Sequence, residues 1–346
     1  MSRCPAQYTG VSVDERGAGM IYDCFTFFNE LDLLEIRLNV LKDVVDKFVL
    51  VEAGETHTGK QKPFYYQENR SRFAAFDEKI IYVKVDRFPG KHDAWWNENY
   101  QRNAIMDGLK DARPDDRVLI SDLDEIPDPA SVAKYSKLPG VYDFREVSYA
   151  LYLNMRDYRT PYTVATRMLP YRDLVSGFDG VEVSYDEFLP ADINQGTTVT
   201  KVRRRSFPKG QKKLIGAGWH FTCLGGAKAV LDKMRAVAPH LGFDPDDQTL
   251  TEEKVADLLV RGQGPGLKLN CFAVPFDGRF PRYILDNRER YAHLIFPVTP
   301  EYMRMTCGPR LFRWLQGRLK YAAEIVLMAT GVHYQLHRLK VWLAKR

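Results

Sequence analysis

The sequence lacks long apolar runs and has few cysteines. No stretch of its 346 residues offers the roughly 18 consecutive apolar positions that a membrane-spanning helix needs. Residues 1–19 contain no apolar segment typical of a secretory signal. The five cysteines are scattered and show no CxxC or Cys/His spacing, which argues against a zinc site or a disulfide framework and favours reduced, buried thiols. We therefore expect a cytoplasmic protein.

The composition is ordinary for a globular protein, except near the C-terminus. Hydrophobic residues make up 45% and charged residues 27%, enough for a sizeable core. The net charge of +5 is concentrated in residues 301–346, where nine Lys and Arg face two acids. The same segment is rich in Leu, Trp, Phe and Tyr. It predicts basic amphipathic helices that either lie on the inner, anionic face of a membrane or pack on the rest of the chain.

Strand-like and helix-like segments alternate up to residue 125. Apolar runs predict strands, and leucines at helical spacing predict a helix over 29–43, with Asn29 as its N-cap. A second helix is expected over 98–109 and a short one over 69–78. The expected strands occupy residues 20–28, 47–53, 79–85 and 117–121.

This alternation predicts an α/β fold with a Rossmann-type, mostly parallel sheet flanked by helices. We expect a flexible leader at 1–19, one domain at 20–295 and a basic helical appendage at 296–346. Aromatic segments with a strand-like pattern, such as VYDFREVSYALYL, continue the domain beyond residue 140.

Three carboxylates follow the last of these strands, in the segment VLISDLDEIP at 118–127. Parallel sheets place ligands at the carboxyl ends of their strands, where Asp122, Asp124 and Glu125 would lie. A D-x-D pair on a strand-to-loop turn can direct both carboxylates at one hard cation, as a departing diphosphate requires. Alternatively, Asp124 or Asp128 only caps a helix that begins near Pro129.

The same D-x-D pattern also occurs in a class of phosphatases. Phosphatases of the haloacid dehalogenase type also place D-x-D after a buried strand, usually with Thr or Val two residues after the second Asp. Here that residue is Ile126, and no convincing later Lys and Asp-Asp set is found. The phosphatase is the less favoured of the two enzymes.

Several blocks of the sequence, taken in order, resemble glycosyltransferase family 17. They include FFNELDLLEIRL at 27–38, DAWWNENYQRNAI at 93–105, SDLDEIP at 121–127, KVRRRSF at 201–207 and AGWHFTC at 217–223. Together they are far more specific than a D-x-D pair alone. The family is similar to GT-A glycosyltransferases, which implies a GT-A-like fold and a metal-dependent transfer of GlcNAc from UDP-GlcNAc with inversion.

The resemblance also implies roles for individual residues. Asp122 and Asp124 would hold Mn²⁺ or Mg²⁺ against the donor diphosphate, with Glu125 orienting a ligand beside them. Glu52 would read the nucleotide base or ribose, unless it is a solvated loop carboxylate. Arg102 would contact the nucleotide or neutralise the carboxylates, unless it forms an ordinary salt bridge.

Three further positions follow from the family blocks. Arg204 or Arg205, in a run of basic residues, would stabilise the departing diphosphate, although such a run could equally be a solvated loop. His220 would be a third metal ligand or would bind the diphosphate, unless it is a packed core histidine. Trp219 would offer an apolar face to the sugar, unless burial alone explains it.

The catalytic base and the acceptor are less defined. An inverting transfer needs a carboxylate base, and five candidates stay open: Glu146, Asp179, Glu182, Asp186 and Glu187. Animal members of the family resemble membrane-anchored enzymes that act on N-glycans. The expected cytoplasmic location favours a bacterial saccharide, such as a lipid-linked precursor, and no nucleic-acid partner. A non-catalytic sugar- or membrane-binding protein of the same fold is the remaining alternative.

Overall fold

A computed structural model of the chain describes most of the domain expected at 20–295. The described residues are 19–90, 93–176, 199–204, 211–236, 249–264 and 269–304, with separate helical positions between 306 and 319. Residues 1–18 of the leader and residues 320–346 of the basic appendage lie outside them. Within the described residues, no helix combines the length and apolarity needed to cross a bilayer.

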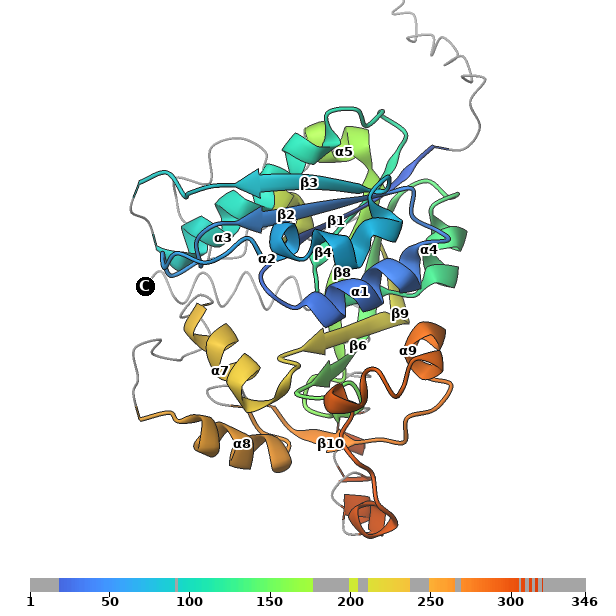
Figure 1. Cartoon of the computed structure of the whole chain (residues 1–346). Coiled ribbons are helices and arrows are strands. Elements are labelled where there is room, and N and C mark those ends of the chain that lie inside the picture. The colour runs from blue at the N-terminus through green and yellow to red at the C-terminus, as the bar shows by residue number, and fades with distance from the viewer. Residues whose placement is uncertain are drawn as a thin grey trace, which may run out of the picture.

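Four parallel strands form the N-terminal half of one large sheet (Figure 1), in the order β3-β2-β1-β4. Their bounds are Ile21–Phe27 (β1), Lys47–Ala53 (β2), Ile80–Val85 (β3) and Arg117–Asp122 (β4). Each strand lies within a residue or so of its predicted position. The α/β class is thus confirmed, and β4 ends at the first of the three carboxylates.

The other half of the sheet is mainly antiparallel. β8 pairs with β4, β6 pairs with β8, and β7 and β10 continue the edge, all in antiparallel fashion. Connections of four residues join β6 to β7 and β7 to β8, and connections this short reverse the direction of the chain. The expectation of a mostly parallel sheet therefore holds for the strands up to β4. Their bounds are Val141–Ala150 (β6), Met155–Asp157 (β7), Tyr162–Pro170 (β8) and Cys271–Ala273 (β10).

A long strand, β9 (Gln211–Thr222), joins the carboxylate turn to the rest of the sheet. It runs parallel to β6 and antiparallel to the short strand β5 (Glu125–Pro127). In this register Glu125 lies opposite His220 and Pro127 lies opposite Gly218. The family blocks SDLDEIP and AGWHFTC are therefore neighbours in space.

Helices cover both faces of the parallel half, because successive side chains of a strand point to opposite faces. Phe25 and Phe27 of β1 pack with Leu34 of α1 (Leu31–Leu41), whereas Cys24 packs with Ile105 on the other face. The remaining elements are α2 (Tyr65–Glu68), η1 (Arg70–Phe76), α3 (Ala94–Asn103), η2 (Ala104–Leu109), α4 (Pro129–Tyr135), α5 (Tyr171–Ser176), α6 (Val199–Arg204), α7 (Gly226–Ala236), α8 (Glu252–Val260), α9 (Arg282–Asp286) and η4 (Ala292–Leu294).

Two helix starts differ from expectation. The helix expected over 98–109 begins at Ala94, where Asp93 accepts a hydrogen bond from the backbone N of Trp96 at 2.8 Å, and it tightens into 3₁₀ geometry at Ala104. Asn29 does not cap α1, because the N-cap position is Glu30 and no side chain caps it. The thiols agree with expectation: Cys24, Cys223 and Cys271 are free and buried, and Cys307 is free and exposed.

Candidate functional site

A buried arginine of α1 binds the backbone of the turn that carries the carboxylates. Arg37 Nη1 donates to the backbone carbonyls of Asp122, Leu123 and Glu125, at 2.9, 3.1 and 2.6 Å. Its Nε and Nη2 bind the two carboxylate oxygens of Asp23, at 2.8 and 2.6 Å, and both side chains are fully buried. One guanidinium therefore fixes the backbone of the whole turn.

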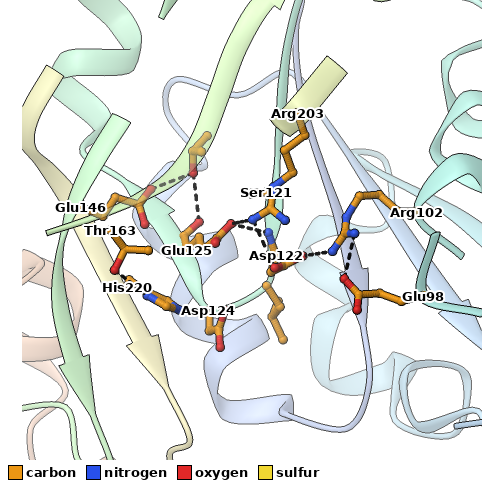
Figure 2. A network of polar contacts seen from close by, with 12 residues as sticks. Glu98, Arg102, Ser121, Asp122, Asp124, Glu125, Glu146, Thr163, Arg203 and His220 are labelled. Carbon is orange, nitrogen blue, oxygen red and sulfur yellow. Dashed lines mark hydrogen bonds and ion pairs between the residues drawn. The ribbon is translucent and has the colours of Figure 1, made fainter. Parts of the chain in front are cut away.

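Asp122 lies between two arginines (Figure 2). Its Oδ1 is 2.7 Å from Arg102 Nη2, and its Oδ2 is 3.1 Å from Arg203 Nη2. Arg102 also binds Glu98, at 2.9 Å, and Arg203 binds Glu125, whose carboxylate accepts from the backbone N of Asp122. Burial opposes ionisation, but Arg203 and Arg102 outweigh it and hold the pKa of Asp122 well below its usual range. Burial raises the pKa of Glu125 in spite of Arg203.

Asp124 faces a second set of cations. Its Oδ2 is 3.1 Å from Lys233 Nζ of α7, and its Oδ1 is 3.6 Å from His220 Nε2 of β9. Lys233 also binds Glu30, at 3.0 Å. Burial opposes the ionisation of Asp124, but Lys233 and His220 hold its pKa well below the usual range. Burial likewise opposes the imidazolium of His220, yet Asp124 raises the pKa of His220 above its ordinary value.

The structure thus gathers five of the residues singled out in the sequence: Asp122, Asp124, Glu125, Arg102 and His220 (Figure 2). It adds four that sequence reasoning missed, namely Glu30, Glu98, Arg203 and Lys233. The basic run at 201–205 was a signal for Arg203, although it did not say which arginine turns inward. No sequence pattern marked Lys233.

The two arginines that were predicted to bind the diphosphate, Arg204 and Arg205, lie where the described part of the chain ends. Arg204 is the last residue of α6, and its side chain is outside the described part of the structure, as is the whole of Arg205. Arg203 is the arginine of this run that reaches the carboxylates.

Glu52 and Trp219 do not join the cluster. Glu52 is fully buried at the end of β2, where it accepts from the hydroxyl of Tyr82 at 2.9 Å and pairs with Lys62 at 3.3 Å. Trp219 precedes His220 on β9 and points to the opposite face, where its indole N donates to the carbonyl of Arg279 at 2.8 Å.

Of the five candidate bases, only Glu146 lies among the described residues, since the other four fall within 177–198. Glu146 is fully buried on β6 and accepts from the hydroxyl of Thr166 at 2.7 Å. Burial and the neighbouring Glu125 raise the pKa of Glu146 well above its usual value. Glu146 is therefore a buried carboxyl group whose surroundings favour its protonated form.

The capping alternative applies to Asp128. Its Oδ2 accepts from the backbone N of Ser131 at 2.8 Å, and Pro129 follows it as the first residue of α4. Asp124 instead binds Lys233 and lies close to His220. Asp128 thus has a structural role as a helix cap, whereas the three preceding acids do not cap this helix.

Replacing Asp128 by alanine should lower the free energy of unfolding by about 1 kcal/mol, the usual effect of losing an N-cap. Urea denaturation measures this change. Because Asp128 lies outside the cluster, nucleotide affinity should stay at the wild-type value. A loss of nucleotide binding in the folded variant would show that Asp128 belongs to the site after all.

The cluster has the charge and the donor atoms for a divalent cation. Five carboxylates (Glu30, Glu98, Asp122, Asp124 and Glu125) surround three permanent cations (Arg102, Arg203 and Lys233), which leaves a charge of −2 when His220 is neutral. Carboxylate oxygens are the ligands that Mg²⁺ and Mn²⁺ prefer. Among the described residues, no three His, Cys, Asp or Glu side chains form a ready metal site. Asp122 and Asp124 could supply two carboxylate ligands, and an ion bound by them would take its other ligands from phosphate groups and water.

Comparison with known proteins identifies the family. The family model of glycosyltransferase family 17 matches residues 7–196, more than half of the chain and all three carboxylates of the turn. The chain belongs to glycosyltransferase family 17. The resemblance seen in its sequence blocks is confirmed. Of the gathered cations, Arg102 lies within the matched region, whereas Arg203, His220 and Lys233 lie beyond it.

Two curated relatives share part of this family 17 chain. The human β-1,4-mannosyl-glycoprotein 4-β-N-acetylglucosaminyltransferase is 39% identical over 107 residues, which cover 29% of this chain and 20% of that protein. The mouse protein of the same name is 38% identical over the same length. The match thus spans about a fifth of the length of these relatives.

Solved structures superpose on the family 17 chain more weakly. A mannosyltransferase from Pyrobaculum calidifontis, in complex with GDP-Man and Mn²⁺, is 13% identical, with 93% of this chain and 88% of that one covered and a TM-score of 0.35. Glucosyl-3-phosphoglycerate synthase from Mycobacterium tuberculosis, in complex with Mn²⁺ and UDP, is 12% identical, with 77% and 92% covered and a TM-score of 0.30.

Proposed function

We propose that this chain is a metal-dependent, inverting glycosyltransferase that transfers GlcNAc from UDP-GlcNAc to a hydroxyl of a saccharide. One observation carries the proposal: Asp122 and Asp124 lie at the carboxyl end of β4 and in the turn after it, each held by cations from other parts of the chain. Family membership supports the reaction class, and the names of the human and mouse relatives support GlcNAc as the sugar.

In this proposal Asp122 and Asp124 hold Mn²⁺ or Mg²⁺, which would neutralise charge on the donor diphosphate as it departs. The buried Arg37 keeps the backbone of their turn in one conformation, because it binds the carbonyls of Asp122, Leu123 and Glu125. Glu125 orients the site from behind, because it bonds the backbone N of Asp122 and pairs with Arg203.

The cations act on the diphosphate itself. Arg102, Arg203 and Lys233 are already drawn into the site by its carboxylates, so they need little rearrangement to reach an arriving anion. A guanidinium can bind two phosphate oxygens at once, which suits Arg203 for stabilising the leaving group. His220, beside Asp124, can donate a hydrogen bond to the same group.

The acceptor is proposed to be a saccharide hydroxyl, with a lipid-linked saccharide as the favoured class. The base that takes its proton is proposed to be a carboxylate, as inversion requires. Glu146 is poorly suited to that task, because its side chain is fully buried and does not reach the surface.

Calorimetric titration with UDP and UDP-GlcNAc, with and without Mn²⁺, tests the proposal. The wild-type chain should bind both nucleotides, and Mn²⁺ should strengthen the binding. Asp124→Ala should weaken the Mn²⁺-dependent binding by about 100-fold or more, because a charged ligand is lost. Asp107→Ala is the matched control, since Asp107 is exposed on η2 and forms a surface ion pair with the exposed Lys110.

Two results would contradict the proposal. Nucleotide affinity that ignores both Mn²⁺ and Asp124→Ala would remove the donor site from this turn. Release of phosphate from an aryl phosphate, without any affinity for UDP, would instead support the phosphatase. A thermal melt of each variant confirms that it is folded before titration.

A further inference from the structure

The short helix α6 (Val199–Arg204) carries Arg203 to the carboxylate cluster. Val199 and Val202 are buried in one apolar cluster, and Arg203 follows them at the spacing that places helical residues on the same face. A helix of six residues is not stable by itself in water, so its position depends on contacts with the rest of the chain.

The beginning of α6 is bound by a side chain of α3. Asn103 Oδ1 accepts a hydrogen bond from the backbone N of Val199, at 3.0 Å. α3 also carries Arg102, which is 2.7 Å from one oxygen of Asp122, whereas Arg203 is 3.1 Å from the other oxygen (Figure 2). Two guanidinium groups of like charge thus meet one carboxylate, and the contact between α3 and α6 sets their relative position.

Near its other end, α6 is bound by a buried arginine of β8. Arg167 Nε and Nη2 donate to the two carboxylate oxygens of Asp143 on β6, at 2.7 and 3.1 Å, and both residues are buried. The third nitrogen, Nη1, donates to the backbone carbonyl of Val202, the residue before Arg203. The planar guanidinium therefore serves an acid and a backbone carbonyl at the same time.

The pair of Arg167 and Asp143 repeats an arrangement found at the carboxylate turn. There, Arg37 binds both oxygens of Asp23 and donates to backbone carbonyls of the turn. In each pair an aspartate matches the charge of the arginine, and a remaining nitrogen of the arginine holds a backbone carbonyl beside the site. One pair holds the segment that carries the acids, and the other holds the helix that carries Arg203.

We propose that Asn103 and Arg167 are positioning residues, which hold Arg203 where it can bind the donor diphosphate. Each acts through the backbone of α6 rather than on the donor. Because the helix is already held, an arriving diphosphate does not have to order both the helix and a long side chain, which would cost binding free energy. The inference rests on the proposed function, since the role of Arg203 at the diphosphate is part of it.

Amide hydrogen exchange without nucleotide tests whether Asn103 holds α6. Asn103→Ala removes the acceptor for the N–H of Val199, so exchange over residues 199–204 should become about fivefold faster or more. Asn103→Asp keeps an acceptor oxygen and should exchange at the wild-type rate. Asn287→Ala is the matched control, because the Asn287 side chain also binds a backbone group, the carbonyl of Tyr283 at 2.8 Å, but does so at the end of α9.

A double-mutant cycle on UDP affinity in the presence of Mn²⁺ tests whether the effect acts through Arg203. Asn103→Ala should weaken binding by about fivefold in the wild-type background. The same change should weaken it by less than about twofold where Arg203→Ala has already removed the guanidinium. Arg167→Lys should depend on Arg203 in the same way, because lysine keeps a charge beside Asp143 but has a single nitrogen with which to donate.

Four results would overturn the inference. They are unchanged exchange over α6 in Asn103→Ala, faster exchange that Asn103→Asp does not restore, an equal loss of affinity with and without Arg203, and an Arg203→Ala variant that binds UDP as tightly as the wild type. A wild-type chain without affinity for UDP would instead contradict the proposed function. The exchange measurement alone would then decide whether Asn103 holds α6 in place.

Discussion

Replacing Arg37 by leucine should lower the free energy of unfolding by about 3–5 kcal/mol. The substitution removes one member of a fully buried ion pair and leaves the carboxylate of Asp23 without its counter-charge. It also takes the donor away from three backbone carbonyls in the turn at 122–125. Buried groups that lose their partners cost far more than exposed ones, so the effect should be among the largest of any single substitution.

Urea denaturation measures the loss, and Arg282→Leu is the control, since Arg282 lies exposed on α9 in a surface pair with Asp286. The control should change the free energy of unfolding by less than about 1 kcal/mol. Below the melting temperature, folded Arg37→Leu should also bind UDP with Mn²⁺ more weakly, because the turn has lost its support. Normal stability in this variant would mean that the turn holds its shape without Arg37.

Gly218→Ala should be nearly as damaging, lowering the free energy of unfolding by about 3–5 kcal/mol. Gly218 has a φ of 147°, which side-chain-bearing residues rarely adopt, and a Cβ there would lie 2.4 Å from the carbonyl oxygen of Ile126 and 2.8 Å from the Cα of Pro127. Both are backbone atoms of the strand β5, which cannot turn aside as a side chain would. The added methyl group must therefore push β9 away from β5.

Gly216→Ala separates the clash from the backbone strain. Gly216 lies on the same strand with a φ of 68°, but a Cβ there meets no atom within 4 Å. That variant should lose only about 1–2 kcal/mol, the cost of the left-handed conformation. The larger loss at Gly218 should come with weaker nucleotide binding, because β9 holds His220 opposite Glu125. Equal losses at the two glycines would contradict the close approach of β5 and β9.

Much of the fold could be predicted from short stretches of sequence. β1, β2 and β4 are largely buried runs, β3 is a partly buried one, and such apolar runs can be recognised within six or seven residues of sequence. The start of α3 was harder to see, because Ala94, Trp95 and Trp96 give no helical alternation and the capping Asp93 lies before them. The tightening at Ala104 has no local signature that we could identify.

The site itself was only half predictable. The acids of the turn are adjacent in the sequence, so their grouping needs no knowledge of the fold. Arg203 and Lys233 reach the same point from α6 and α7, and only tertiary packing decides which of several basic residues faces inward. Successive residues of a helix point about 100° apart, so a run of arginines predicts a basic segment but does not predict which arginine faces the site. The burial of Glu52 similarly depends on Tyr82 and Lys62, which come from other segments.

The division of charge along the chain has a consequence for biosynthesis. All five carboxylates of the cluster lie at or before Glu125, whereas two of its three permanent cations, Arg203 and Lys233, come after residue 200. A nascent chain that has been made as far as Glu125 therefore carries all five acidic groups with Arg102 as their one permanent counter-ion from this set, and like charges held together oppose compaction. Two of the three permanent cations are added only when α6 and α7 have been synthesised and packed. The strands that begin the sheet are made early, and the charged cluster at their carboxyl ends is completed by residues that are made later.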